Sequence, residues 1–186
     1  DPPAAFLRQG LALRLPEDSV SVEDVEPLVA PGAGLQRHFL QRAVFDALLN
    51  GDTDGLQASL RARAMLPSGP VGRRELDALL SEVRPYADVF SRWRKGDPAA
   101  RLFELDVEGI RFHGRIEDLY RNGLARMRFD ELHGPAQIAH GLDWLVLSAL
   151  GDSRPLVQFA KFANAPGLQS RLAISPERAK AVLHEL

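Results

Sequence analysis

Two neighbouring segments of the chain carry the residues whose types and spacing could support phosphate or metal chemistry. Glu117 ends the segment at residues 114–117, and Arg126 and Arg128 stand two apart in the segment at residues 124–128. Residues two apart on a strand share a face, so the two arginines are expected side by side. Guanidinium groups contact phosphates well but cannot ligate a metal cation. The pattern therefore favours a positively charged strand face.

Arginine is concentrated around these two segments. The candidate nucleic-acid contacts are five arginines, namely Arg111, Arg115, Arg121, Arg126 and Arg128. Only two acids, Glu117 and Asp118, lie in the same stretch. Any single arginine on an exposed strand is commonly just solvated, but five together predict a local positive strip able to meet phosphates.

The elements that position these residues follow from hydrophobic periodicity. Residues 102–107, 110–117 and 124–129 alternate apolar and polar, which is typical of half-buried strands. Glu108-Gly109 and Asn122-Gly123 between them fit two-residue turns. We therefore predict a three-stranded antiparallel meander. With Asn122-Gly123 as the turn, Glu117 lies opposite Arg128, and the two are predicted to form an ion pair.

Apolar residues recur with a helical period elsewhere in the chain. Helices are predicted at about residues 35–50, 54–65, 73–93 and 135–150, the last with Ile138 and Leu142 in its inner stripe, and another from Ser175 onwards. Pro85 is expected to kink or split the third helix. Two short strands are predicted at residues 156–162 and 168–174.

These elements predict an α/β (α+β) fold in which helices flank a mixed β-sheet built on the meander. Residues 1–98 form an N-terminal helical part, and residues 99–186 form the sheet core. Residues 16–34 contain five acids and no base, which indicates an exposed acidic loop. The chain starts without Met and stops inside a helical pattern, so we expect it to be a fragment of a larger protein.

Composition excludes several classes of protein. The 186 residues include no cysteine, which excludes disulfides, thiolate metal sites and cysteine nucleophiles. The net charge is -2, with 26% charged residues, so the chain does not bind nucleic acid by bulk positive charge. No apolar run approaches the ~20 residues of a membrane span. His133 and His140 are poorly spaced for zinc, and no serine-hydrolase or Walker pattern is present.

The segment from Gly114 to Arg128 resembles the core of PD-(D/E)xK nucleases of the RecB type. In that pattern Gly-x-x-Asp ends one strand and acid-x-Lys follows on the next, so that carboxylates bind Mg²⁺ beside the scissile phosphate. Here Glu117 takes the place of the aspartate, while Arg126 and Arg128 replace the acid and the lysine. The resemblance implies a nuclease-like fold with no catalytic residue and no bound metal.

Most of the chain is similar to the RecC C-terminal domain family, through residues 6–16, residues 109–120 and the helix from Gln137 to Gly151. This resemblance implies a restriction-endonuclease-like core in a non-catalytic, DNA-contacting domain. The implied host is a cytoplasmic RecBCD-type ATP-dependent helicase–nuclease, exodeoxyribonuclease V, which acts at double-strand ends in recombinational repair. The implied partners are the RecB and RecD subunits and double-stranded or forked DNA ends, without a membrane. ATP and Mg²⁺ would be used by the partner subunits, with no cofactor in this domain.

Two alternatives stay open. An active metal-dependent nuclease would need substitute ligands, for example Glu104 or Asp106 joining Glu117. A pure protein-interaction domain would make no DNA contact. For the first interpretation we expect weak DNA binding by the isolated chain, micromolar at best, because the basic strip is small and the chain is slightly acidic.

Overall fold

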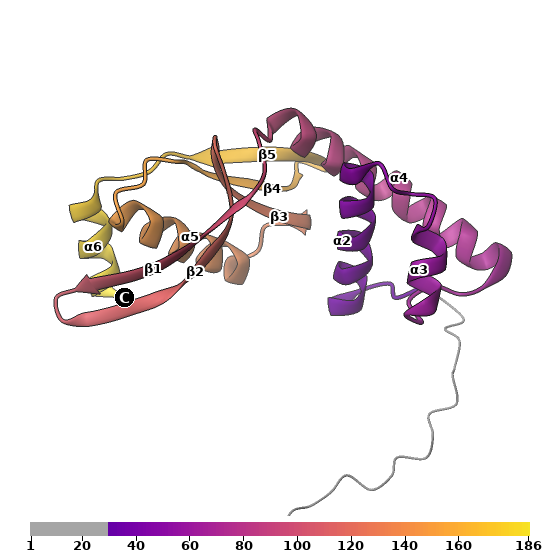
Figure 1. Cartoon of the computed structure of the whole chain (residues 1–186), viewed down its shortest axis with the longest axis horizontal. Helices are drawn as coiled ribbons and strands as arrows, with labels where there is room; N and C mark the ends of the chain where they lie inside the picture. Colours follow the sequence, from indigo (N-terminus) through magenta and orange to yellow (C-terminus); the bar gives the residue numbers. More distant parts are fainter. Residues whose placement is uncertain (1–29) are drawn as a thin grey trace, which may run out of the picture.

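The computed structural model describes residues 30–186. Residues 6–16 and the acids from Glu17 to Glu26, on which part of the sequence analysis rests, lie outside these described residues. The elements are α2 (Gly34–Asn50), α3 (Leu56–Ala62), α4 (Gly69–Trp93), β1 (Ala99–Val107), β2 (Ile110–Tyr120), β3 (Gly123–Glu131), α5 (Gly134–Ala149), β4 (Leu156–Phe162), β5 (Ala165–Arg171) and α6 (Pro176–Glu185). Figure 1 shows α2, α3 and α4 at one end and α6 at the other.

A five-stranded sheet in the order β1-β2-β3-β4-β5 forms the middle of the molecule. All neighbouring strands are antiparallel except β3 and β4, which are parallel and connected through α5. Parallel neighbours need such a crossover, because a tight turn can join only antiparallel strands. The mixed sheet, its flanking helices and the helical N-terminal part confirm the predicted α+β class.

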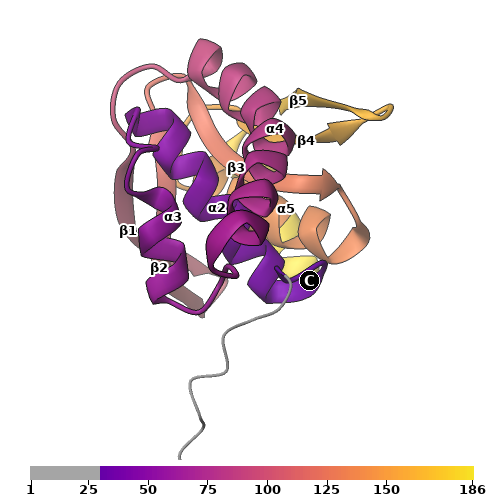
Figure 2. The same cartoon turned by 90° about the vertical axis from the view of Figure 1, so that its right-hand side faces the viewer.

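The helices α2 and α4 pack on one face of the sheet at β3 and β4, and α3 packs against these two helices (Figure 2). Their apolar residues continue into those strands as one buried cluster, so the helical part and the sheet share a core. Of the predicted kink or split at Pro85, the split does not occur, because α4 runs through this residue as one helix. Pro85 lies on the exposed side of α4, so the ring meets solvent and the buried stripe on the opposite side is uninterrupted.

Aromatic rings form the centre of this first core. Phe90 on α4 contacts four rings at centroid distances of 5.1–5.7 Å, those of Phe45, Trp93, Tyr120 and Phe159. Most of these pairs are edge-to-face, the arrangement that ring quadrupoles favour. The buried Tyr86 hydroxyl donates a hydrogen bond to the carbonyl of Phe129 (3.0 Å), which ties α4 to the end of β3.

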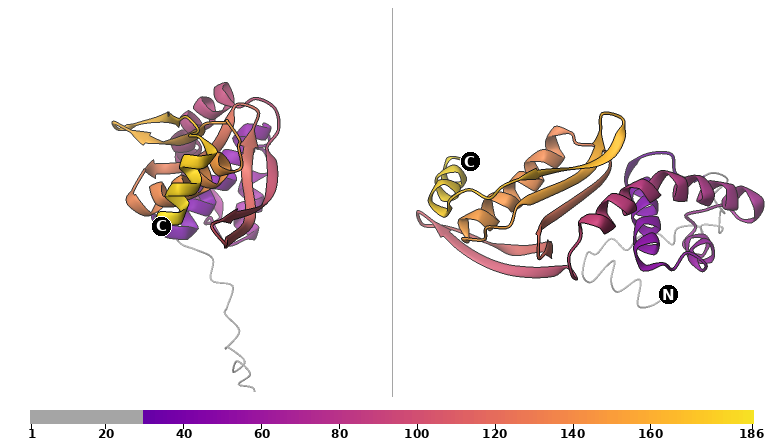
Figure 3. Two further views of the ribbon diagram at one scale, coloured as in Figure 1. Left: turned by 90° about the vertical axis from the view of Figure 1, so that its left-hand side faces the viewer. Right: turned by 90° about the horizontal axis from the view of Figure 1, so that it is seen from above.

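A second core lies on the other side of the sheet, where α5 and α6 pack on β1 and β2. Figure 3 shows both helices on this side, next to the long β1–β2 hairpin. Ser175 caps α6, since its hydroxyl accepts a hydrogen bond from the N–H of Arg178, and Pro176 occupies the first turn. The predicted start of this helix is therefore confirmed.

The turn between β2 and β3 differs from the prediction. Gly123 pairs with Tyr120, so the two turn residues are Arg121 and Asn122 rather than Asn122 and Gly123. The Asn122 side chain donates to the carbonyl of Trp93 at the end of α4 (2.6 Å). A Cβ at position 123 would lie 2.8 Å from the carbonyl oxygen of Pro155. Tertiary contacts thus assign this glycine to the strand.

The two other hairpins have two-residue turns in the left-handed region. Glu108 and Gly109 join β1 to β2, as predicted. Ala163 and Asn164 join β4 to β5, so β5 begins at Ala165, three residues earlier than predicted, and includes a proline. An edge strand tolerates proline because its outer N–H groups have no ladder partner.

Candidate functional site

The strands β2 and β3 separate almost at once after their turn. Only Leu119↔Leu124 and Tyr120↔Gly123 are paired, and then β3 continues beside β4 alone. Asp118, immediately before the paired residues, has a φ of 59°, and the register between β1 and β2 shifts at the same level. Such a bulge bends a strand and ends its pairing. The predicted three-stranded meander is thus limited to a short contact between β2 and β3.

The side chain of Arg126 fills the gap that this separation leaves. Its Nη1 donates to the carbonyl of Glu117 on β2 (3.0 Å) and to that of Ala125 on β3 (2.9 Å). Its Nη2 and Nε donate to Asp143 on α5 at 2.6 and 3.0 Å, and Asp118 lies 3.9 Å away. The guanidinium therefore connects three elements, as its rigid set of donors allows.

Arg126 is consequently not the solvent-facing strand residue that the alternation suggested. Its side chain is only 14% exposed, because α5 covers this part of β3. The residues of α5 that reach the strand are His140 and Asp143, which sequence analysis did not assign to a site. They stand three apart and so share a helix face, a spacing that could have signalled them.

The predicted inner stripe of this helix was partly wrong. Ile138 is exposed and Leu142 is 41% exposed, while the buried residues are Ala136 and the run from Trp144 to Ala149. The face toward β3 and β4 is therefore polar at its N-terminal half. Polar partners on the strands make this arrangement possible.

His140 contacts the strand β4 through a second buried polar group. Its Nδ1 lies 3.0 Å from Nε2 of Gln158, a side chain almost fully buried under α5. Because an amide nitrogen only donates, Nδ1 accepts and the imidazole is neutral in this contact. Burial, then the nearby charge of Arg126, lower the pKa of His140, while Asp143 opposes them and Arg128 adds to them. These effects together favour the neutral form.

The predicted Glu117–Arg128 ion pair is not formed. Glu117 instead pairs with Arg115 at 3.0 Å, and both side chains are largely exposed. The turn at Arg121 and Asn122 moves the register by two residues, which brings Arg126 rather than Arg128 to the level of Glu117. The separation of the strands then leaves Arg128 beyond the reach of β2.

The five candidate arginines lie in separate places. Arg111 is opposite Asp106 near the tip of the β1–β2 hairpin, and Arg115 is further along the same exposed face. Arg121 is in the β2–β3 turn, with its side chain over Gly96. Arg126 and Arg128 are on β3, the first under α5 and the second at the wall of a pocket. They do not form a single continuous strip.

The carboxylates of this region do not form a metal site. Glu104 is opposite His113 and Asp106 is opposite Arg111. At about 3.3 Å per residue, these positions are roughly 13 and 20 Å along β2 from Glu117. Among residues 30–186, no group of three or more His, Asp and Glu side chains is arranged to hold a metal ion. The donor set therefore does not fit the Mg²⁺ that the nuclease resemblance would imply.

A shallow recess of about 330 Å³ opens at the separation of the strands. Arg126 and Asp143 lie within it, together with Asp118, Glu117 and Arg42 from α2. The lining contains three arginines and three carboxylates. The recess is thus a neutralised charge cluster in which a guanidinium lies among the carboxylates.

Comparison with known families identifies the chain. A family model described as the RecC C-terminal domain matches residues 1–186, the whole chain. No curated protein matches it significantly. Within the part of the chain that the structure describes, no helix is long and apolar enough to cross a membrane. The chain belongs to the RecC C-terminal domain family and so represents part of the RecC subunit of a RecBCD-type complex, exodeoxyribonuclease V, of DNA repair and recombination.

Proposed function

We propose that this domain is a non-catalytic part of the RecC subunit that contacts DNA and docks partner subunits. The position and bonds of Arg126 support the non-catalytic role. This arginine stands where the nuclease pattern has a metal-binding acid, and its guanidinium is bonded to Asp143 and to the Glu117 carbonyl. A fixed positive charge at this place repels a divalent cation and keeps the nearby carboxylates paired.

This arrangement also accounts for how the fold persists without a metal. In a metal site, a cation offsets the repulsion between neighbouring carboxylates. Here the Arg126 guanidinium supplies that positive charge to Asp118 and Asp143 from within the chain. The domain accordingly has no cofactor of its own, and ATP and Mg²⁺ are used by the partner subunits.

DNA contact is supported by the arginines whose side chains, unlike that of Arg126, do not connect elements of the fold. Arg111 and Arg121 are exposed, Arg115 shares only a surface pair with Glu117, and Arg128 has no ion pair among the described residues. Their phosphate contacts would release few counterions, so the binding of double-stranded or forked ends is weak and depends on salt.

The first test is metal-dependent cleavage of DNA by the 186-residue chain. We expect no degradation of linear or forked duplex with Mg²⁺ or Mn²⁺. Cleavage by the wild-type chain that disappears in Glu117→Ala would show an active nuclease. Glu185→Ala, the same change at an exposed residue of α6, serves as the control for nonspecific loss of activity.

The second test is a fluorescence titration with forked duplex at two salt concentrations. Micromolar binding that weakens as salt rises supports the DNA-contacting role. Nanomolar binding insensitive to salt contradicts it.

A pure protein-interaction domain is the second candidate, and exposed apolar side chains favour it. Ile138 is 66% and Leu172 is 77% exposed, and Leu142 and Leu168 are also exposed. Exposed apolar side chains that lie together on a surface are typical of subunit contacts. Absence of DNA binding even at low salt would favour this candidate, and docking of the RecD subunit would then be the main role of the domain.

A further inference from the structure

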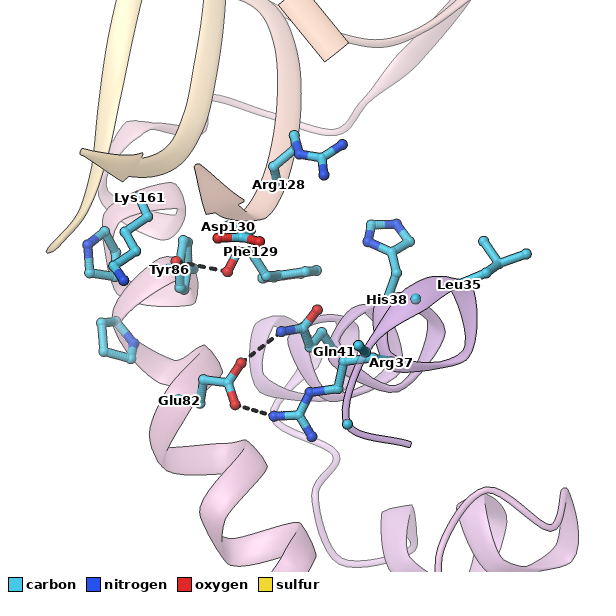
Figure 4. Close-up of a pocket in the computed structure, with 15 residues that line it drawn as sticks. Leu35, Arg37, His38, Gln41, Glu82, Tyr86, Arg128, Phe129, Asp130 and Lys161 are labelled. Atoms are coloured by element: carbon cyan, nitrogen blue, oxygen red, sulfur yellow. Dashed lines mark hydrogen bonds and ion pairs between the residues drawn. The ribbon is translucent and has the colours of Figure 1, made fainter. Parts of the chain in front are cut away.

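A larger pocket than the recess at Arg126 lies at the other end of β3. Its volume is about 880 Å³, and its walls come from the start of α2, the middle of α4, the end of β3 and the β4–β5 hairpin. Figure 4 shows His38 and Arg128 on one side of it and Lys161 on the other, with Asp130 and Phe129 between them. None of these residues belongs to the strand separation described above, so the pocket is a distinct feature.

Two cations of this pocket are not neutralised by the protein. The side chains of Arg128 and Lys161 form no hydrogen bond or ion pair with any residue in the described range, and the Nε of Arg128 is buried without a partner. The third cation, Arg37, is bonded to Glu82. Since a buried donor without a partner is unfavourable, a ligand that accepts from Arg128 would remove a penalty present in the free protein.

The acids of the pocket offset these charges only in part, because neither Glu82 nor Asp130 forms an ion pair with Arg128 or Lys161 among the described residues. The two oxygens of Glu82 are taken by Arg37 and by Gln41, whose amide donates at 2.7 Å (Figure 4). Asp130 accepts from the N–H of Glu131 through one oxygen. The first turn of α2, which forms part of the wall, contains no acid and has no side-chain cap. Its free N–H groups add to the positive character of the wall.

We propose that this pocket binds a phosphate group of a single nucleic-acid strand, with Arg128 as its principal contact and Lys161 as the second. The inference rests on the proposed DNA-contacting role and assigns it to one site. Arg128 offers a fork of donors that matches two phosphate oxygens, and Lys161 offers a mobile point charge on the opposite wall.

The position of Arg128 favours a single strand over a duplex. The pocket has walls from four parts of the chain, and the Arg128 side chain is half-buried at its wall. The phosphates of a stiff duplex enter such a recess less easily than those of a flexible strand, which can bend a phosphate into it. The volume of the pocket leaves space for the sugar and base attached to that phosphate.

The test is fluorescence anisotropy with the 186-residue chain and a labelled single-stranded oligonucleotide, compared with its duplex. We expect tighter binding of the single strand. In Arg128→Gln, binding should weaken about tenfold, and the slope of log K against log salt should fall by about 0.7. Lys161→Gln should weaken it severalfold. Arg178→Gln, an equal charge change on the exposed surface of α6, is the matched control and should leave binding unchanged.

The outcomes separate this inference from the proposed function. If the chain binds DNA and Arg128→Gln and Lys161→Gln bind as well as the wild type, the pocket is not the site, although the DNA-contacting role stands. If the chain binds no DNA at low salt, both fail. If poly-glutamate displaces the oligonucleotide at equal charge concentration, the assignment to a nucleic-acid phosphate is overturned. Urea midpoints equal to that of the wild type verify that each variant is folded. If Arg128→Gln unfolds, the binding of Lys161→Gln alone shows whether the pocket is the site.

Discussion

The two faces of β3 have different surroundings. Ala125, Met127 and Phe129 pack into the aromatic core beneath α2 and α4. On the opposite face, Arg126 bonds with α5, and Arg128 lies at the wall of the large pocket. One strand therefore joins a dry core to a polar cluster.

The difference shows where the fold is stabilised and where it is free to vary. Apolar burial is non-directional, so the aromatic face holds the strand in place through many small contacts. The polar face depends on particular donors and acceptors, and each loss leaves a buried partner unsatisfied. A residue on the polar face can therefore be replaced only where the replacement satisfies the same hydrogen-bond partners.

The largest effect is expected on the aromatic face. Phe90→Ala removes the ring that contacts four others and leaves a cavity, so the free energy of unfolding should fall by about 3–5 kcal/mol. Urea denaturation followed by circular dichroism measures it. Phe39→Ala, an identical change at a side chain that is 53% exposed, is the control. Equal losses for the two variants would contradict a stabilising aromatic core.

On the polar face, Arg126→Met keeps an unbranched side chain about as long as the aliphatic part of arginine but removes every donor. The free energy of unfolding should fall by about 2–3 kcal/mol, because Asp143 loses its partner and the Glu117 carbonyl loses a donor. Arg126→Lys should recover only part of this loss, since one ammonium cannot reach the same set of acceptors. Full recovery with lysine would show that charge alone matters.

The polar face should also make stability depend on pH. The pKa of His140 is lowered in the folded chain, mainly by burial, so the unfolded chain binds more protons just below pH 6.5. Stability is therefore complete above about pH 6.5 and decreases as pH falls toward the folded pKa, by at most about 1.4 kcal/mol per pH unit for this group.

His140→Asn supplies the comparison, because the asparagine oxygen can still accept from Gln158 but does not titrate. Urea midpoints between pH 5 and 8 should vary less in this variant. His38, whose pKa is also lowered by burial, then by Arg128 and Arg42, accounts for part of the dependence that remains. An unchanged pH profile in His140→Asn would mean that this histidine is not coupled to folding.

The smallest effect is expected at the exposed pair of Arg115 and Glu117. Arg115→Met should change the free energy of unfolding by less than about 0.5 kcal/mol, because both side chains are largely in solvent. The same arginine-to-methionine change at Arg126 is the internal comparison, measured by the same urea denaturation. A loss at Arg115 as large as that at Arg126 would show that exposure does not separate the two sites.

Local patterns predicted most of the elements. The alternation of Phe103, Leu105 and Val107 identified β1 and its buried face, and Ser175-Pro176 located the start of α6. These signals lie within one element, so their physical basis is local. The α+β class follows from the order of such elements along the chain.

The site was predicted less well, because it depends on contacts between elements. Asn-Gly is a strong turn signal, but the bond from Asn122 to Trp93 and the tight space around Gly123 moved the turn by one residue. That shift brought Arg126 rather than Arg128 to the level of Glu117. The two arginines therefore have different surroundings, although both are on β3. The roles of His140, Asp143 and Gln158 arise from the packing of α5 across two strands, which no single-strand pattern contains.

We infer that Arg126, bonded to Asp143, holds the polar face together without a metal. A double-mutant cycle with Arg126→Met and Asp143→Ala, measured by urea denaturation with and without Mg²⁺, tests it most directly. We expect a coupling free energy of unfolding of at least about 1 kcal/mol between the two changes. We also expect Mg²⁺ to leave the free energy of unfolding of all four proteins unchanged. Additive losses within about 0.5 kcal/mol, or a wild-type chain that Mg²⁺ stabilises, would contradict it.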